Sequence, residues 1–111
     1  MEIDFSHVPC KYWSDNVKMS YLQRRIIVYS IAYYELNETI VNDKQYDDIS
    51  RQLVRMMKEC SEEECKKTDY WYCMSDFDGS TGFDLFSRLT PQDQHYLFKL
   101  TKSIININKY K

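Results

Sequence analysis

Hydrophobic residues recur at helical spacing through the first half of the chain. In the segment 15–37 they share one helical face at positions i, i+4, i+7 and i+11. These residues are Leu22, Ile26, Tyr29 and Tyr33. The segment 43–60 carries a second apolar stripe, formed by Tyr46, Ile49, Leu53, Met56 and Met57. Because only a short connection separates the two segments, we predict an antiparallel helical hairpin. Ser14 or Asp15 would cap the first helix and Asn42 the second.

The second half of the chain contains two further helix starts. Ser61 is followed three residues later by Glu64, which is the spacing of a capping box, within a charged run typical of a solvated helix. The helix that begins there would direct three residues toward a core: Tyr70, Trp71 and Cys73. Thr90 as cap and Pro91 at the first helical position predict a C-terminal helix over 91–107. Its apolar stripe comprises Leu97, Leu100, Ile104 and Ile107.

Composition limits the fold to one small domain. The chain has 111 residues, with two glycines and two prolines. Both glycines fall in the segment 76–84, which is therefore predicted to be a shaped loop. Because tight hairpin turns need glycine, a many-stranded sheet is disfavoured. We expect a single all-α domain over 1–111, with an N-terminal arm (1–14), the hairpin (15–60) and a C-terminal helical part (61–111).

Charge and hydropathy exclude several classes of protein. The chain carries 15 Lys and Arg against 17 Asp and Glu, a net charge of -2. A dedicated nucleic-acid binder would show a basic surface instead. No segment approaches the roughly 20 apolar residues of a transmembrane helix. The acidic N-terminus also lacks the features of a signal peptide. We expect a cytoplasmic protein with no membrane contact and no direct nucleic-acid binding.

The cysteines give little support for a metal site. They are Cys10, Cys60, Cys65 and Cys73. In a cytoplasmic protein they would be thiols rather than disulfides. Their spacing lacks the two close pairs of a zinc site, although His7 near Cys10 leaves a zinc cluster conceivable. Free thiols are the favoured interpretation, and no bound metal is expected.

The most enzyme-like string lies in the loop 76–84. Asp76-Phe77-Asp78-Gly79 resembles the nucleophile motif of the haloacid dehalogenase phosphatases. That chemistry needs a parallel sheet and downstream partner residues, for which the helical pattern after the loop leaves no room. The spacing of an EF-hand calcium loop is also missing. A glycine-bearing turn between two helical parts is the better interpretation.

A second constellation spans the predicted hairpin. Two tyrosines end the first helix, an aspartate follows, and a Tyr-Asp pair opens the second helix. These residues are Tyr33, Tyr34, Asp43, Tyr46 and Asp47. The stretch 22–53 that contains them resembles, without a gap, the N-terminal Ia domain of bacterial NAD-dependent DNA ligases. As a stand-alone chain it resembles the short ligase-related proteins of phages and prophages.

The resemblance implies a site for NAD+ or for its nicotinamide mononucleotide half. Tyr33 and Tyr46 would stack or pack on the nicotinamide ring. The ribose, amide or phosphate would be bound by Tyr34, Asp43 and Asp47. The residue types suit this ligand independently, because aromatic faces beside carboxylates attract a flat cation. Tyrosines at helical spacing are also common in helix packing, and an aspartate in a first turn can serve only the helix dipole.

Several positions depart from the ligase pattern. Asn37 replaces the aspartate that usually follows the paired aromatics, and Thr39 stands where proline is frequent. The Lys-x-Asp-Gly nucleophile motif is absent, since the nearest string has Asp76 in the place of the lysine. An aspartate cannot form the phosphoramide bond with AMP. We therefore expect a non-catalytic binding protein rather than an enzyme.

A different class of function is also compatible with the sequence. A small, mildly acidic chain rich in tyrosine could be a phage anti-defence protein, such as an anti-CRISPR inhibitor. It would block a host nucleic-acid-processing protein, because aromatic residues and carboxylates are common in such interfaces. The candidate carboxylates are Asp43, Asp47, Asp48, Glu62, Glu63 and Glu64. A ligand site needs Tyr33 and Asp43 to converge in a concave pocket, whereas an inhibitor needs exposed aromatic residues and carboxylates on a convex face.

Overall fold

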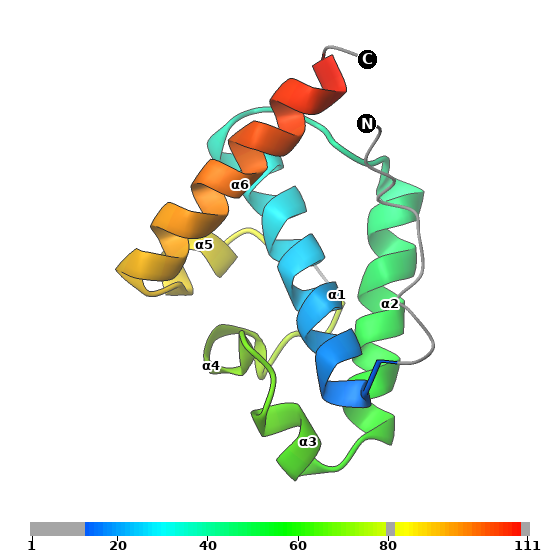
Figure 1. Cartoon of the computed structure of the whole chain (residues 1–111). Coiled ribbons are helices and arrows are strands. Elements are labelled where there is room, and N and C mark those ends of the chain that lie inside the picture. The colour runs from blue at the N-terminus through cyan, green and yellow to red at the C-terminus, as the bar shows by residue number, and fades with distance from the viewer. Residues whose placement is uncertain (1–12, 80–81, 110–111) are drawn as a thin grey trace.

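A central helix, α1 (Asp15–Ser30), organises the fold. The structure, a computed structural model, describes residues 13–79 and 82–109. Over these residues the chain is all-α, as the sequence predicts. Every residue from Arg25 to Ser30 is buried, as expected for a helix covered on several sides. Figure 1 shows that α2 flanks α1 on one side and the helices of the second half of the chain flank it on the other.

The predicted hairpin is confirmed. Helix α1 continues into a π-helical turn, η1 (Ile31–Glu35), and α2 (Asp43–Glu59) then runs back antiparallel to α1 (Figure 1). Asn42 caps α2 as predicted. Its Oδ1 accepts a hydrogen bond from the Gln45 N–H (2.8 Å), while its own N–H donates to Gln45 Oε1 (3.0 Å). This reciprocal capping box fixes the point at which the second helix begins.

The end of the first helical segment is set by Asn37. Its φ of 53° lies in the left-handed region, which asparagine tolerates better than most residues. The Glu38 N–H donates to the Ala32 carbonyl (2.7 Å) and the Leu36 N–H to the Ile31 carbonyl (3.1 Å). These bonds close the widened last turn and direct the chain into the connection that leads to α2.

The prediction of one continuous helix from Ser61 through Cys73 is wrong, because the structure has two short helices there. Ser61 does cap a helix, because its Oγ accepts from the Glu64 N–H (3.2 Å), but α3 (Glu62–Lys66) is short. A separate helix, α4 (Trp71–Met74), follows it. The break allows buried Gln23 of α1 to bond the intervening segment. Its Nε2 donates to Thr68 Oγ1 (2.9 Å), and its Oε1 accepts from the Tyr70 N–H (3.0 Å). Tyr70 and Cys73 are buried as predicted, and Trp71 is half-buried.

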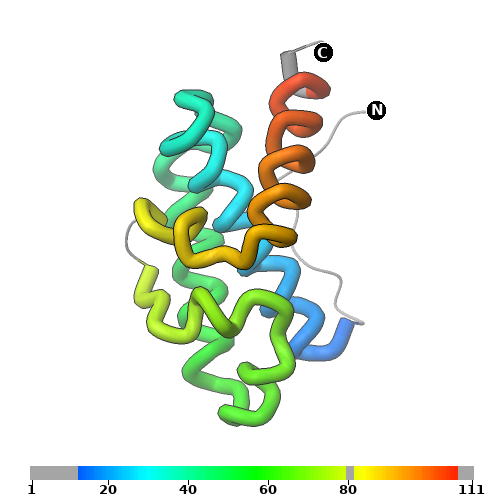
Figure 2. Tube along the Cα trace, turned by 90° about the vertical axis from the view of Figure 1, so that its left-hand side faces the viewer, coloured from blue at the N-terminus to red at the C-terminus, as the bar shows by residue number. Residues whose placement is uncertain are grey.

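The chain returns through α5 (Leu85–Arg88) to the long helix α6 (Pro91–Lys109), as Figure 2 shows. Thr90 caps α6 as predicted, since its Oγ1 accepts from the Asp93 N–H (3.2 Å). Tyr72 Oη donates to Asp93 Oδ2 (2.5 Å), which fastens α4 to the same helix start.

The apolar stripe of α6 differs from the prediction at its C-terminal end. Leu97 and Ile104 are buried and Leu100 is half-buried, but Ile107 is 41% exposed and Ile105 is buried instead. Thr101 is also fully buried, because its hydroxyl donates to the Leu97 carbonyl (2.7 Å) and needs no water. The buried face of α6, which packs on α1 and η1, therefore includes a polar residue that a hydrophobic pattern leaves out. Among the described residues no helix is both long enough and apolar enough to cross a membrane.

Candidate functional site

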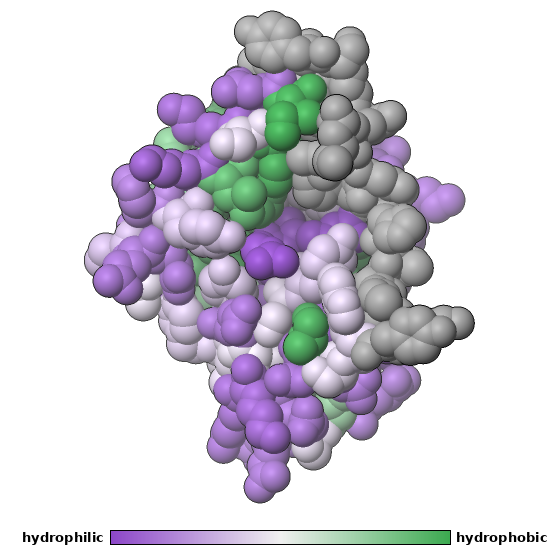
Figure 3. All heavy atoms as spheres, in the orientation of Figure 1, coloured by the Kyte–Doolittle hydropathy of each residue, from purple (hydrophilic) through white to green (hydrophobic). Residues whose placement is uncertain are grey.

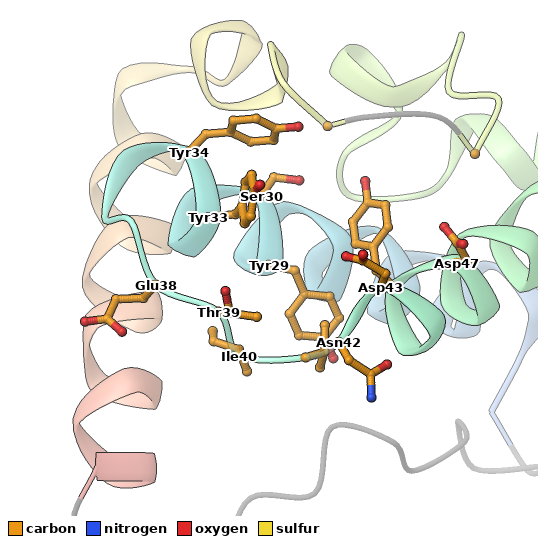
Figure 4. Close-up of a pocket in the computed structure, with 14 residues that line it drawn as sticks. Tyr29, Ser30, Tyr33, Tyr34, Glu38, Thr39, Ile40, Asn42, Asp43 and Asp47 are labelled. Atoms are coloured by element: carbon orange, nitrogen blue, oxygen red, sulfur yellow. The ribbon is translucent and has the colours of Figure 1, made fainter.

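A pocket opens where the two arms of the hairpin meet. It lies between the end of α1, η1, the connection to α2 and the first turn of α2, and its volume is about 410 Å³ (Figure 4). All five residues singled out in the sequence line this one pocket: Tyr33, Tyr34, Asp43, Tyr46 and Asp47. The hairpin brings them together because it places the last turn of one helical segment beside the first turn of the next. Their role in ligand binding stays a prediction.

Aromatic rings form one side of the pocket. Tyr33 and Tyr34 pack edge to face with ring centroids 4.9 Å apart, and Tyr34 packs in the same way on Phe83 at 5.6 Å. Tyr29 lines the pocket from α1 and is buried. Tyr33 and Tyr34 are 59% and 41% exposed, so their rings remain available to a ligand.

The exposure of Tyr33 corrects the sequence interpretation, which placed it on the buried stripe of the first helix. Leu22, Ile26 and Tyr29 of that stripe are buried. After Ser30, however, the helix widens into the π turn, and Tyr33 lies in this turn at the pocket, where its ring packs on Tyr34. Helical spacing alone does not show which part of a helical face other elements cover.

Tyr46 is the half-buried aromatic residue of the α2 side. Burial raises the pKa of its hydroxyl above the ordinary value, although hydrogen bonding to Ser30 and Ser50 acts in the opposite direction. The phenol is therefore neutral at physiological pH and can donate or accept a hydrogen bond.

Two carboxylates lie on the α2 side of the pocket. Asp43 and Asp47 are exposed and stand one helical turn apart, so they share a face of α2. Glu38 contributes to the lining, but its carboxylate points away toward α6 (Figure 4). Of the described residues that line the pocket, none is a lysine or an arginine. The arrangement suits a flat ligand with hydroxyl or amide donors and a positive charge.

The loop before α5 supplies a wall that sequence reasoning missed. Gly79 and Gly82 both line the pocket. Gly79 has a φ of +92°, a conformation that favours glycine. Gly82 lies so close to the Ser30 side chain that a β-carbon on it would clash with Ser30 Oγ. The only available signal was that the chain places both of its glycines in this loop.

Arg88 holds this loop in place. Its Nη1 donates to Asp76 Oδ1 (2.7 Å) and to the Cys73 carbonyl (3.2 Å), and its Nη2 lies 2.9 Å from Asp84 Oδ2. The hydrogen bond from Arg88 lowers the pKa of the Asp76 carboxyl below its ordinary value. Asp76, which stands at the nucleophile position of the phosphatase-like string, is thus engaged in an ion pair that fixes the loop.

The described cysteines are free thiols: Cys60, Cys65 and Cys73. Burial raises the pKa of all three thiols, that of Cys73 to about 11. No group of three His, Cys, Asp or Glu side chains able to hold a metal occurs within 13–79 and 82–109. The zinc cluster considered around His7 and Cys10 lies outside the described residues, as do residues 1–12 of the predicted N-terminal arm (1–14).

The carboxylates of the alternative, inhibitor-type interface fall into two groups. Asp43, Asp47 and Asp48 lie at the start of α2, whereas Glu62–Glu64 lie on α3, beyond the opposite end of α2 (Figure 1). A helix of this length spans about 25 Å. Hydrophilic residues dominate the lower end of the molecule around α3, while hydrophobic residues gather over α6 in the same view (Figure 3). The six carboxylates therefore do not form one continuous patch.

Comparison of the chain with protein-family models, with curated proteins and with solved structures gives no match.

Proposed function

We propose that this chain is a non-catalytic binding protein whose pocket takes the nicotinamide ring and ribose of NAD+ or nicotinamide mononucleotide. The observation that supports this most strongly is the convergence of five residues with ligase-Ia-like spacing on a single pocket: Tyr33, Tyr34, Asp43, Tyr46 and Asp47. A volume of about 410 Å³ is within the range of small-molecule sites.

Each side of the pocket has a distinct role in this proposal. The ring faces of Tyr33 and Tyr46 contact the pyridinium ring, where cation–π attraction adds to the burial of apolar surface. Asp43 and Asp47 accept hydrogen bonds from the ribose hydroxyls, which are stronger than neutral pairs because the acceptor is charged. The Tyr34 hydroxyl hydrogen-bonds the carboxamide in this proposal.

The proposal is confined to binding because the sequence has no counterpart of the ligase nucleophile motif. The half-buried Tyr46, with its raised pKa, is also a poor general base at neutral pH. Any chemistry on the bound ligand would then belong to a partner enzyme. A cytoplasmic location, where NAD+ is plentiful, is part of the same proposal.

Titration calorimetry with NAD+ and nicotinamide mononucleotide tests the proposal. Tyr33→Ala removes an exposed ring and should weaken binding about tenfold through the lost stacking and cation–π contact. Tyr96→Ala is the matched control, since Tyr96 is similarly exposed (51%) but lies on α6 and does not line the pocket. No heat at millimolar ligand, or an equal effect of both variants, would contradict the proposal.

The exposed aromatic rim keeps the second candidate function, a phage anti-defence protein, open. Phe83 is 69% exposed and continues the row formed by Tyr33 and Tyr34. Rows of exposed aromatics are frequent in protein interfaces. In this alternative the same rim binds a host nucleic-acid-processing protein. Phe83→Ala would then abolish capture of that protein from host lysate.

A further inference from the structure

The described lining of the pocket contains carboxylates and no lysine or arginine. Asp43 and Asp47 contribute two carboxylates, and no lysine or arginine is among the described residues of the wall. The remaining polar groups are hydroxyls, amides, backbone and the Glu38 carboxylate, which points away from the pocket toward α6 (Figure 4). A bound anion would therefore face repulsion with no compensating ion pair, whereas a cation would be attracted.

The backbone at the start of α2 gives an anion little help. Helix N-termini bind phosphate through free N–H groups. Here the Gln45 N–H is taken by Asn42 Oδ1 and the Tyr46 N–H by the Asn42 carbonyl. Asp43 adds a carboxylate in the first turn, which offsets the positive end of the helix dipole.

Basic side chains lie farther along the same helix. Arg51, Arg55 and Lys58 line a separate groove, which shares only Gly79 with the pocket. Within the described part of the chain, α2 thus presents Asp43 and Asp47 to the pocket from its first two turns and basic residues outside the pocket.

These charges have a consequence for the choice of ligand. We infer that the pocket, if it binds nicotinamide compounds as proposed above, takes the phosphate-free, positively charged pyridinium nucleoside in preference to the mononucleotide. Nicotinamide riboside carries one positive charge on its ring. The mononucleotide adds a phosphate of about −1.5 to −2 charges beside Asp43 and Asp47.

Calorimetry with three probes measures this preference: nicotinamide riboside, its reduced form with an uncharged ring, and nicotinamide mononucleotide. At low salt the riboside should bind about fivefold more tightly than either of the other two, and the margin should shrink at high salt. Asp43→Asn with Asp47→Asn removes both charges at nearly constant shape. It should weaken riboside binding and strengthen mononucleotide binding.

Asp48→Asn is the matched control, because Asp48 is an exposed neighbour on α2 that does not line the pocket. It should leave the ratio of the two affinities unchanged. Mononucleotide affinity equal to or above that of the riboside would overturn the inference while leaving the proposed function intact. Absence of binding by every probe would overturn both.

Discussion

The side-chain oxygen of Ser30 occupies the space that a β-carbon on Gly82 would need. Ser30 is buried, and its hydroxyl donates to the Ile26 carbonyl (2.9 Å), so it is held in this position. A β-carbon on Gly82 would also lie 3.1 Å from Leu85 Cδ1. The end of α1 and the loop before α5 can approach this closely only because residue 82 has no side chain, and both residues line the pocket.

Gly82→Ala should therefore destabilise the fold by about 1–3 kcal/mol, since the added methyl group must displace packed atoms. The free energy of unfolding, measured by urea denaturation, checks this. In a Ser30→Ala background the conflict with Oγ is gone, and the same substitution should cost less. A double-mutant cycle with no coupling between the two positions would contradict the close contact.

We expect the two buried hydrogen bonds of the Gln23 side chain to make a large contribution to the free energy of unfolding. Gln23→Leu keeps the volume but removes the acceptor of the Tyr70 N–H and the donor to Thr68. Leaving such buried groups unpaired should cost about 1–3 kcal/mol in the free energy of unfolding. Gln92→Leu, at an exposed position of α6, is the control and should change it by less than about 0.5 kcal/mol. Equal effects would contradict the role assigned to Gln23.

The ion pair between Asp76 and Arg88 should make stability depend on acid pH. The pKa of Asp76 is lower in the folded chain than its ordinary value, because Arg88 donates to its ionised form. The stabilisation is therefore present above about pH 4 and is lost as the pH falls through the folded pKa. Asp76→Asn should be less stable than the parent chain at pH 6, and the two should converge as the pH falls below about 4 and the Asp76 carboxylate is protonated.

Urea unfolding at several pH values measures this convergence. Asp69→Asn serves as the control, because Asp69 is exposed and outside the ion pair with Arg88. A constant difference between Asp76→Asn and the parent chain across this pH range would show that ionisation of Asp76 is not involved.

Cys73 should be nearly inert toward alkylating reagents in the folded state. Burial raises the pKa of its thiol to about 11, so the reactive thiolate is only about a thousandth of the population at pH 8. Cys60 is half-buried and should react faster. Timed labelling with iodoacetamide followed by peptide mass spectrometry separates the two sites. Urea should equalise their rates, and equal rates without urea would contradict the burial of Cys73.

Local sequence signals predict helix boundaries well in this chain. Asn42, Ser61 and Thr90 all cap helices as expected, because a cap depends on residues within one turn. Errors arise where distant contacts compete with local preference. The helix from Ser61 is interrupted because Gln23, far away in the sequence, bonds the segment around Tyr70.

Some features of the candidate site likewise follow from the local sequence, whereas others depend on contacts between distant residues. The spacing of Tyr33, Asp43 and Tyr46 in the sequence is enough to predict that they meet at the end of a hairpin, and they do line one pocket. The exposure of Tyr33 is not predictable from that spacing, since it depends on which distant elements cover the end of the first helical segment. The pocket wall at Gly79 and Gly82 is not predictable either.

The sequence by itself therefore determined the all-α fold, the hairpin and the position of Asp43 and Asp47 on one face at the start of α2, because these follow from interactions within a few residues. Only the tertiary structure decided the shape of the pocket. The wall formed by the loop before α5 depends on the contact of Gly82 with Ser30 and on the ion pair between Arg88 and Asp76. Contacts between residues so far apart in the chain arise from the packing of whole helices, which no local pattern records.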